Sequence, residues 1–341
     1  MSDKIEIFDF SNSLTAKGVF YGGDAGAKEA IIFNDVTWMI KYPKTTRDLI
    51  NPQISYTTSP LSEYLGSKIY EILGFPVHEV LIGVRKNKIV VACRDFTKEI
   101  RQMLVTKEFA KKNPAYQNKI NQLVPIMYSA KELIHFHYLK NNFMANDLDE
   151  YSGTGSETFL DEVLATIKGE PTLSSVEGVL ERFWDMFVID AFIGNNDRNN
   201  GNWGLLMDNE TKIMELAPVY DNGNAFFNKR SLKQMATRLA DEEAMKQDAY
   251  HTPTCVYKYT GLDNEGHKIN PFKFIEDGID SDCTAAVNRF VQKVDMEKIK
   301  SLIDCIPETI GTLAIMPAIQ KEFYLELLAL KLEKLNCVAK K

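Results

Sequence analysis

The polar segment NNDRNNGN, from Asn195 to Asn202, is the part of the sequence whose residue types most clearly suggest chemistry. Asp197 lies in it, five positions before Asn202, and Asp221 follows in the later stretch LAPVYDNG. An Asp, an Asn five residues on and a second Asp beyond a hairpin form the set that kinase-type phosphoryl transfer uses. The first carboxylate can orient an attacking hydroxyl and take its proton, while the Asn oxygen and the second carboxylate are hard ligands for Mg²⁺. Asn-rich loops are also common as plain turns, so the order of the three residues is what favours catalysis.

Two charged residues upstream fit the same chemistry. Lys41 lies inside the otherwise apolar run TWMIKYP, from which a lysine can reach the phosphates of a nucleotide. Glu63 follows in the first turn of a predicted helix, where it can pair with Lys41. The plainer interpretations are a strand-edge lysine in solvent and an acid that stabilises a helix N-terminus. The glycine-rich run FYGGDAGAKEA does not match a P-loop. Its backbone amides at Gly22, Gly23 and Gly26 can cover phosphates, and a simple hairpin turn is the equally supported alternative.

The elements expected to position these residues begin with a β-rich N-terminal part. Short runs rich in β-branched and aromatic residues, with turn breaks between them, predict strands. These runs lie at residues 5–10, 17–23, 29–34 and 37–43. Residues 77–96 predict a hairpin that turns at Lys86–Lys88. A single helix is predicted over 59–74, with Ser59 as its N-cap and Pro60 at the first helical position.

The rest of the chain, after about Phe96, has apolar residues at helical spacing. Helices are expected within residues 157–168, 175–194, 283–294, 296–306 and 318–335. Between them, NWGLLMD and KIMELAPVYDNG predict a small hairpin that turns at Asp208–Asn209. We therefore expect an α+β fold of the two-lobed protein-kinase type. Residues 1–97 would form the β-rich nucleotide-binding lobe with one helix, and 98–341 the helical lobe with the catalytic loop and metal site. A cleft between two such lobes is a natural ligand site.

Composition limits the class of partner. A formal net charge of −7 and a pI of about 5.4 disfavour charge-driven contact with nucleic acid. No apolar run is long enough to span a membrane. The N-terminal MSDKIEIFDF lacks the apolar core of a signal peptide, so we expect a cytoplasmic protein, or one exported by a route without such a signal.

The five cysteines lack CxxC spacing and the five histidines lack a zinc pattern. His135 and His137 are expected to point to different sides of a helix.

The segment FWDMFVIDAFIGNNDRNNGNWGLL, followed by LAPVYDNG, resembles the HipA-like serine/threonine kinase family, and is most similar to its CtkA-type branch of proinflammatory bacterial kinases. The runs GGDAGAKEAIIFNDVTWMIKYPK, SEYLGSKIYEILG and KIVVACRDF are similar to the N-lobe of that branch, so the likeness covers most of residues 18–225. A departure is Asn196, which precedes the Asp in a loop where the family often has a His. The resemblance implies that Asp197 is the catalytic Asp and that Asn202 and Asp221 are the two Mg²⁺ ligands. It also implies that Lys41 binds ATP and that Glu63 is the acidic partner of this lysine.

The expected function is ATP- and Mg²⁺-dependent transfer of a γ-phosphate to Ser or Thr hydroxyls of a protein substrate. The resemblance also implies autophosphorylation in a loop near the nucleotide, for which the connection 43–60 and the polar loop 146–157 offer hydroxyls. Two alternatives stay open. A small-molecule phosphotransferase uses the same Asp, Asn and Asp. The other alternative is a non-catalytic nucleotide-binding partner in a toxin module, which the presence of all the expected polar groups disfavours. The oligomeric state does not follow from the residues.

Overall fold

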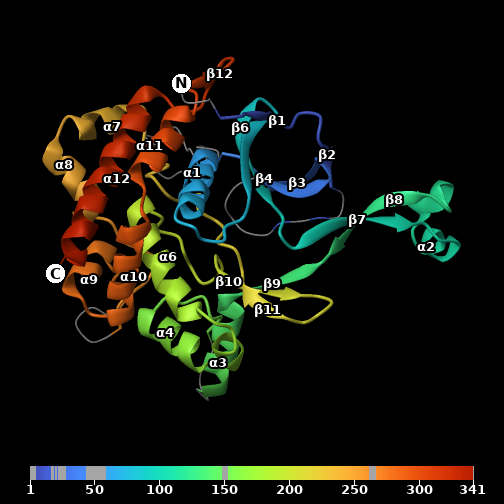
Figure 1. Cartoon of the computed structure of the whole chain (residues 1–341), viewed down its shortest axis with the longest axis horizontal. Coiled ribbons are helices and arrows are strands. Elements are labelled where there is room, and N and C mark those ends of the chain that lie inside the picture. Colours follow the sequence, from blue (N-terminus) through green and yellow to red (C-terminus); the bar gives the residue numbers. More distant parts are fainter. Residues whose placement is uncertain are drawn as a thin grey trace.

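A β-sheet with one helix lies beside a larger, mainly helical part (Figure 1). The structure is a computed structural model of the whole chain, and it describes residues 5–16, 19, 21, 28–43, 59–147, 153–260 and 266–340. The two-lobed α+β architecture expected from the sequence is therefore confirmed. None of the described helices combines the length and the apolar character that crossing a membrane would need.

The N-terminal sheet has six strands in the order β1-β5-β6-β4-β3-β2. Strand β1 runs parallel to β5, and the other neighbours are antiparallel. The expected hairpin is present and turns at Lys86 and Asn87, which have φ of 50° and 54°, as tight hairpin turns require. The strands are β1 (Phe8–Asp9), β2 (Leu14–Thr15), β3 (Lys28–Phe33), β4 (Val36–Lys41), β5 (Val80–Arg85) and β6 (Lys88–Arg94).

Helix α1 (Ser59–Ile72) packs against β5 and β6. Ser59, expected as the N-cap, is its first helical residue. Leu61, Leu65 and Ile69 recur every four residues and are buried, so they form one apolar face of the helix. Each buried side chain of this kind contributes about 1.5–3 kcal/mol. This packing fixes the position of the helix, and with it the position of Glu63, relative to the sheet.

A two-stranded ribbon projects from the molecule where the sequence predicted helices (Figure 1). Strands β7 (Lys98–Leu104) and β8 (Leu123–Ser129) pair antiparallel, and α2 (Lys107–Lys112) and a 3₁₀ turn at Pro114–Lys119 connect them. The expectation of helices directly after Phe96 is wrong for this stretch. Its strands are largely exposed and pack on a small cluster of Val105, Ala110 and Val124, so they lack a strong apolar alternation.

The helical part surrounds α6 (Val179–Ile193), which is buried along most of its length. The helix begins four residues later than the pattern suggested, because Gly178 precedes it with a left-handed φ of 79°. Beside α6 lies a three-stranded sheet in the order β11-β10-β9, which contains the expected hairpin. Its strands are β9 (Lys131–His135), β10 (Gly204–Asp208) and β11 (Met214–Leu216).

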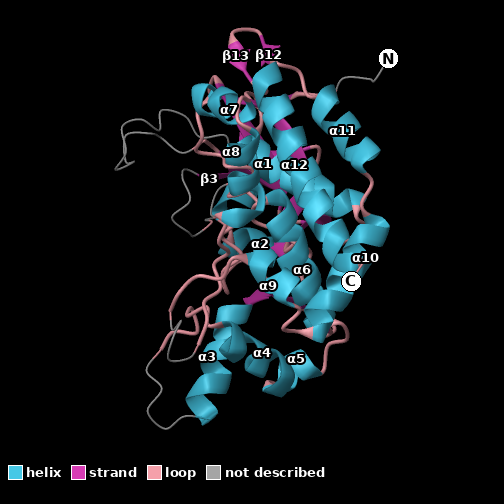
Figure 2. Cartoon of the chain, turned by 90° about the vertical axis from the view of Figure 1, so that its left-hand side faces the viewer, coloured by secondary structure: helices cyan, strands magenta, loops and turns pink. Residues whose placement is uncertain are grey.

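Four of the remaining helices, α4, α9, α10 and α12, pack against α6 (Figure 2). The helices expected near residues 160, 285, 300 and 325 are present, with ends shifted by a few residues. They and the others are α3 (Phe136–Asp147), α4 (Leu160–Gly169), α5 (Pro171–Ser174), α7 (Leu232–Leu239), α8 (Glu242–Lys246), a π-helical turn (Gln247–His251), α9 (Pro271–Asp277), α10 (Ser281–Lys293), α11 (Met296–Cys305) and α12 (Ala318–Ala339), with a small pair β12 (Thr309–Ile310) and β13 (Leu313–Ala314) before the last helix.

Candidate active site

Three charged residues from distant parts of the sequence meet between the sheet and the helical part. Lys41 ends β4 and Asp221 follows β11. Glu63 lies in the second turn of α1 and not, as expected, in the first, because the helix already begins at Ser59. The Lys41 Nζ atom is 2.7 Å from Glu63 Oε2 and 2.9 Å from Asp221 Oδ1. Burial opposes the charge on Lys41, but the carboxylates of Asp221 and Glu63 outweigh it and raise the lysine pKa well above its usual value. The lysine is therefore a fixed positive charge.

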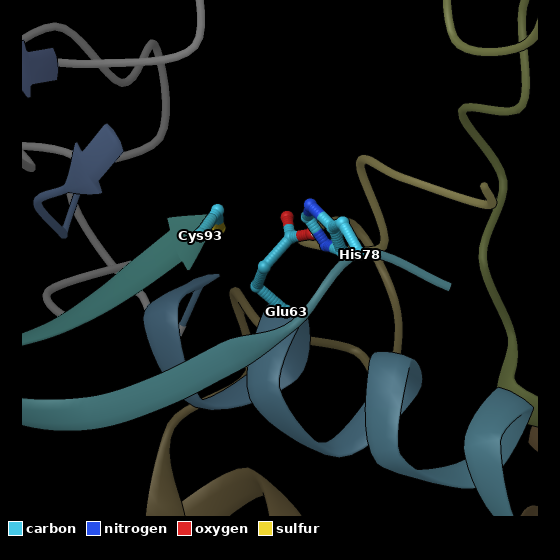
Figure 3. A group of neighbouring side chains, drawn as sticks. All are labelled: Glu63, His78 and Cys93. Carbon is cyan, nitrogen blue, oxygen red and sulfur yellow. The ribbon is translucent and has the colours of Figure 1, made fainter. Parts of the chain in front are cut away.

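Glu63 is fully buried and uses both carboxylate oxygens. Oε2 accepts from Lys41, and Oε1 lies 3.0 Å from the backbone nitrogen of Asn222 and 3.0 Å from His78 Nε2. Burial raises the pKa of the carboxyl group, but Lys41 and His78 outweigh burial and hold it below its usual range. Figure 3 shows Glu63 beside His78, with Cys93 on the neighbouring strand β6. Potential ligand atoms of the three lie within 4.8 Å of one another. Since both Glu63 oxygens are already engaged, we interpret this cluster as a structural support.

The loop between α6 and β10 is held in shape by Arg198. Its guanidinium group is 2% exposed and bonds Asp190 in α6, with 2.8 Å between Nε and Oδ2. It also donates to the carbonyl of Tyr220, to the Asn202 carbonyl at 3.1 Å and to Asn222 Oδ1 at 2.5 Å. Burial disfavours the charge, but Asp190 outweighs burial and raises the arginine pKa. One buried cation thus joins the loop to the segment that carries Asp221.

Asp197 itself is exposed, although the backbone around it is fixed. Its N–H donates to Asn195 Oδ1 at 3.2 Å, and its carbonyl accepts from Asn202 Nδ2 at 2.7 Å. Its Oδ1 accepts from Asn199 Nδ2 at 3.0 Å. The buried Asn200 ties the loop to the helical part, because its Nδ2 donates to the carbonyls of residues 155 and 157. The loop therefore presents one carboxylate from a rigid frame.

A cleft of about 1,400 Å³ is lined by four of the five predicted residues that the structure describes. That volume exceeds the range of about 300–1,000 Å³ typical of small-molecule pockets, so a nucleotide leaves room for a second reactant. A smaller adjoining cavity is lined by Glu63 as well as by Lys41, Asp197 and Asp221. Gly22, Gly23 and Gly26 lie outside the described residues, and their contacts stay a prediction. The predicted residues that line the large cleft are Lys41, Asp197, Asn202 and Asp221.

The cleft also has polar walls that the sequence patterns did not indicate. His135 and His137 stack with ring centroids 5.6 Å apart, so the expectation that they point to different sides is wrong. His135 ends β9 and His137 is the second residue of α3, and a helix spacing rule does not apply across that junction. Burial lowers the pKa of both imidazoles. The hydroxyl of Tyr220, the residue directly before Asp221, lies 2.9 Å from His135 Nδ1. This contact links the histidine pair to the segment that carries Asp221.

Gly66 allows α1 to approach the segment after Asp221. A Cβ atom there would lie 2.7 Å from the Asn222 Cβ and 3.4 Å from Ile193 Cδ1. We predict that Gly66→Ala lowers the free energy of unfolding by about 1–3 kcal/mol, because overpacking outweighs the gain of about 1 kcal/mol in helix propensity. Urea denaturation measures this change, with the exposed Glu71→Ala on the same helix as control. Equal stability of the two variants would contradict the close contact.

A two-lobed fold with a buried lysine–glutamate pair and a loop that presents Asp197 near Asp221 has the architecture of a protein kinase. No protein-family model matches the chain. Over 317 residues the chain is 31% identical to the serine/threonine-protein kinase CtkA of Helicobacter pylori (strain J99 / ATCC 700824), covering 93% of this chain and 82% of that protein. The chain therefore belongs to the CtkA-type serine/threonine protein kinases.

Solved structures agree with this assignment. The crystal structure of the Helicobacter pylori proinflammatory kinase CtkA matches with a TM-score of 0.76 and 28% identity, over 98% of both chains. A complex of HipA, HipB and operator DNA from Shewanella oneidensis MR-1 matches with a TM-score of 0.50 and 12% identity, over 96% of this chain and 70% of that chain. The second likeness concerns the fold alone.

Proposed function

We propose that the protein transfers the γ-phosphate of ATP to Ser and Thr hydroxyls of a protein substrate in the presence of Mg²⁺, and that it also phosphorylates itself. The observation that carries the proposal is the contact of Lys41 with both Glu63 and Asp221, at 2.7 and 2.9 Å. A lysine fixed as a cation in a cleft beside a carboxylate-bearing loop is the arrangement that binds and orients nucleotide phosphates.

The donor set of the cleft fits a magnesium ion. Asn202 gives its amide nitrogen to the carbonyl of Asp197, so its Oδ1 is the atom left to bind a cation. Asp221 keeps a side chain that is 31% exposed, and only Oδ1 contacts Lys41. Both residues supply hard oxygen atoms, which Mg²⁺ prefers. A magnesium ion held by Asn202 and Asp221 would neutralise charge on the phosphates of the nucleotide.

Asp197 is the residue we assign to the acceptor hydroxyl. Its carboxylate is exposed to the cleft, and Asn199 holds Oδ1 at 3.0 Å. The other oxygen can accept the hydrogen bond of a Ser or Thr hydroxyl, orient its oxygen and receive its proton as the phosphate bond forms. Asp221 has a backbone φ of 60°, a conformation that non-glycine residues adopt mainly where the structure imposes it. This places its carboxylate beside Lys41.

The remaining parts of the proposal concern partners. The acceptor is a protein, and direct contact with nucleic acid is not part of the mechanism. Hydroxyls for autophosphorylation lie in the 43–60 connection, of which 44–58 are outside the described residues, and in the 146–157 loop, of which 148–152 are also outside them. The five cysteines are free thiols, which supports a reducing, cytoplasmic location.

The test of the proposal follows the label from γ-labelled ATP. We expect label in protein rather than in the small-metabolite fraction, which separates a protein kinase from a small-molecule phosphotransferase. Asp197→Ala should lower the rate by about 100-fold or more, because it removes the general base, and should leave ATP affinity unchanged in calorimetry. An Asp197→Ala variant as active as the wild type would remove the residue from this role, and label in metabolites alone would overturn the protein acceptor.

A further inference from the structure

A second cavity, of about 310 Å³, lies on the helical side of the catalytic loop. Its walls come from the loop at Asn196, from Asn224 and Lys229 in the segment after Asp221, and from Lys331 of α12. Asn224 and Lys229 also line the small cavity that contains Asp197 and Asp221. The second cavity therefore adjoins the place where the acceptor hydroxyl would lie, although it is outside the nucleotide cleft.

Lys331 is the unusual member of this wall. It is fully buried, and its Nζ has no hydrogen-bond partner among the residues that the structure describes. A Cβ at Gly194 would lie 2.9 Å from this Nζ, so the glycine leaves the room that the ammonium group occupies. Burial lowers the lysine pKa to about 7. The Phe272 ring, whose centroid is 5.9 Å from Nζ, and the carboxylate of Asp248 attract the ammonium group, but neither accepts a hydrogen bond from it. A buried cation without a hydrogen-bond acceptor is costly, and an arriving anion would supply one.

The other charges at the cavity leave it cationic. The carboxylate of Asp190 also lines it, but Arg198 engages both of its oxygens. Arg230 lines the wall and is paired with Asp248, whereas Lys229 is exposed at the rim. Since the one lining carboxylate is neutralised by an arginine, a ligand entering the cavity meets an excess of positive charge.

We propose that this cavity is a subsite for one anionic group of the substrate polypeptide, a carboxylate or a phosphate, with Lys331 as its buried cation. The assignment of the anion to a substrate rests on the proposed kinase function. The cavity lies at the lower end of the volume range of small-molecule pockets, so it fits a side chain better than a second cofactor. A charged hydrogen bond formed away from water is stronger than a neutral one. The subsite would therefore select substrates with an acidic or phosphorylated residue near the acceptor.

The first experiment measures anion binding without catalysis. Inorganic phosphate is titrated into the full chain while the side-chain signal of Lys331 is followed by NMR, with the assignment taken from its loss in Lys331→Met. We expect a phosphate-dependent shift of this signal and, by calorimetry, at least about 10-fold weaker phosphate binding at this site in Lys331→Met. Lys229→Met, at the rim, should weaken it by a few fold. An unchanged Lys331 signal at saturating phosphate would overturn the subsite.

The second experiment measures selectivity in catalysis. Serine peptides that differ only in one flanking residue, glutamate, phosphoserine or glutamine, are compared by kcat/KM. In the wild type, we expect the better of the two anionic peptides to have a kcat/KM about 10-fold higher than that of the glutamine peptide. This ratio of kcat/KM values should fall close to one in Lys331→Met but not in the control Lys334→Met. Lys334 lies on the same helix and pairs with Glu276. The ranking of glutamate and phosphoserine identifies the source of the anion.

The two experiments separate the subsite from the kinase assignment. A ratio that is the same in wild type and Lys331→Met would refute the selectivity. If no peptide or protein is phosphorylated while phosphate still shifts the Lys331 signal, the proposed function has failed and the anion site stands.

Discussion

Arg198→Met is expected to lower the free energy of unfolding by about 3–5 kcal/mol and to reduce kinase activity strongly. The reason is that removal of one partner from a buried ion pair leaves the other charge unpaired. Asp190 is 4% exposed, and beyond Arg198 it accepts hydrogen bonds from the neutral groups of Tyr70 and Asn195. Without the guanidinium group, the loop would also lose its bonds to the carbonyls of Asn202 and Tyr220.

Arg289→Met is the matched control for this prediction. Arg289 pairs with Asp185, which is in the same helix as Asp190, at 2.8 Å, but the arginine is 28% exposed and far in sequence from the loop. Its loss should cost less stability and leave activity at the wild-type level. Adding Asp190→Asn to Arg198→Met should restore part of the lost stability, because the unpaired charge is then removed. Urea denaturation and the labelled-ATP assay measure both effects. Equal loss of activity in the two arginine variants would show that Arg198 has no specific role in the loop.

The contacts of the site follow from the sequence where local patterns are strong. A strand that ends at Lys41 and a helix whose apolar residues recur every four positions place Glu63 at the sheet, and the two side chains meet. The hairpin between Asp197 and Asp221 is equally clear, since strands β10 and β11 are short and apolar. Periodicity and turn signals determine these elements with few alternatives.

The roles of the loop asparagines could not be derived in the same way. Sequence patterns left Asn195, Asn196, Arg198, Asn199 and Asn200 open between shaping the loop and meeting a substrate. Asn195 and Asn199 bond residues at most five positions away, but the hydrogen bonds that tie the loop to the rest of the fold depend on groups far away in the sequence. Arg198 bonds residues 20 and more positions later, and Asn200 bonds carbonyls more than 40 positions earlier. Such contacts form only once the whole fold has brought distant segments together, and no local rule contains them.

Two features of the fold were missed by the prediction from the sequence, the ribbon β7–β8 and the buried Lys331. The ribbon β7–β8 was missed because its strands bury little apolar surface and carry charged or polar residues at most positions of β7, so no apolar pattern marks it in the sequence. Lys331 was missed although a signal was present. Tyr324, Leu328 and Leu335 mark the buried face of α12, and Lys331 lies on that face between the last two. A lysine in the apolar stripe of a helix is rarely fully buried, and this pattern could have marked the residue for attention.

Lys331→Met is expected to make the protein more stable at pH 6, on the order of 3–5 kcal/mol. In the wild type the pKa of Lys331 is lowered from 10.5 to about 7 in the folded state by burial. Below pH 7 both states of the chain are protonated, and the folded state bears the full cost of a buried ammonium group. Methionine has a similar length and no charge, so the variant avoids this cost.

The advantage of methionine should shrink as the pH rises. Between pH 7 and about 10.5 the unfolded chain binds a proton at Lys331 that the folded chain has released, so the wild type gains stability with increasing pH. The gap between wild type and Lys331→Met should narrow by about 1.4 kcal/mol for each pH unit above 7. Urea denaturation at pH 6 and pH 9 measures the gap. Lys334→Met, which loses a more exposed ammonium group paired with Glu276, should show no such narrowing. If the difference in the free energy of unfolding between wild type and Lys331→Met is the same at pH 6 and pH 9, Lys331 keeps its proton in the folded state at pH 9. In that case the ammonium group already has a partner, and the cavity would lose the reason for attracting an anion.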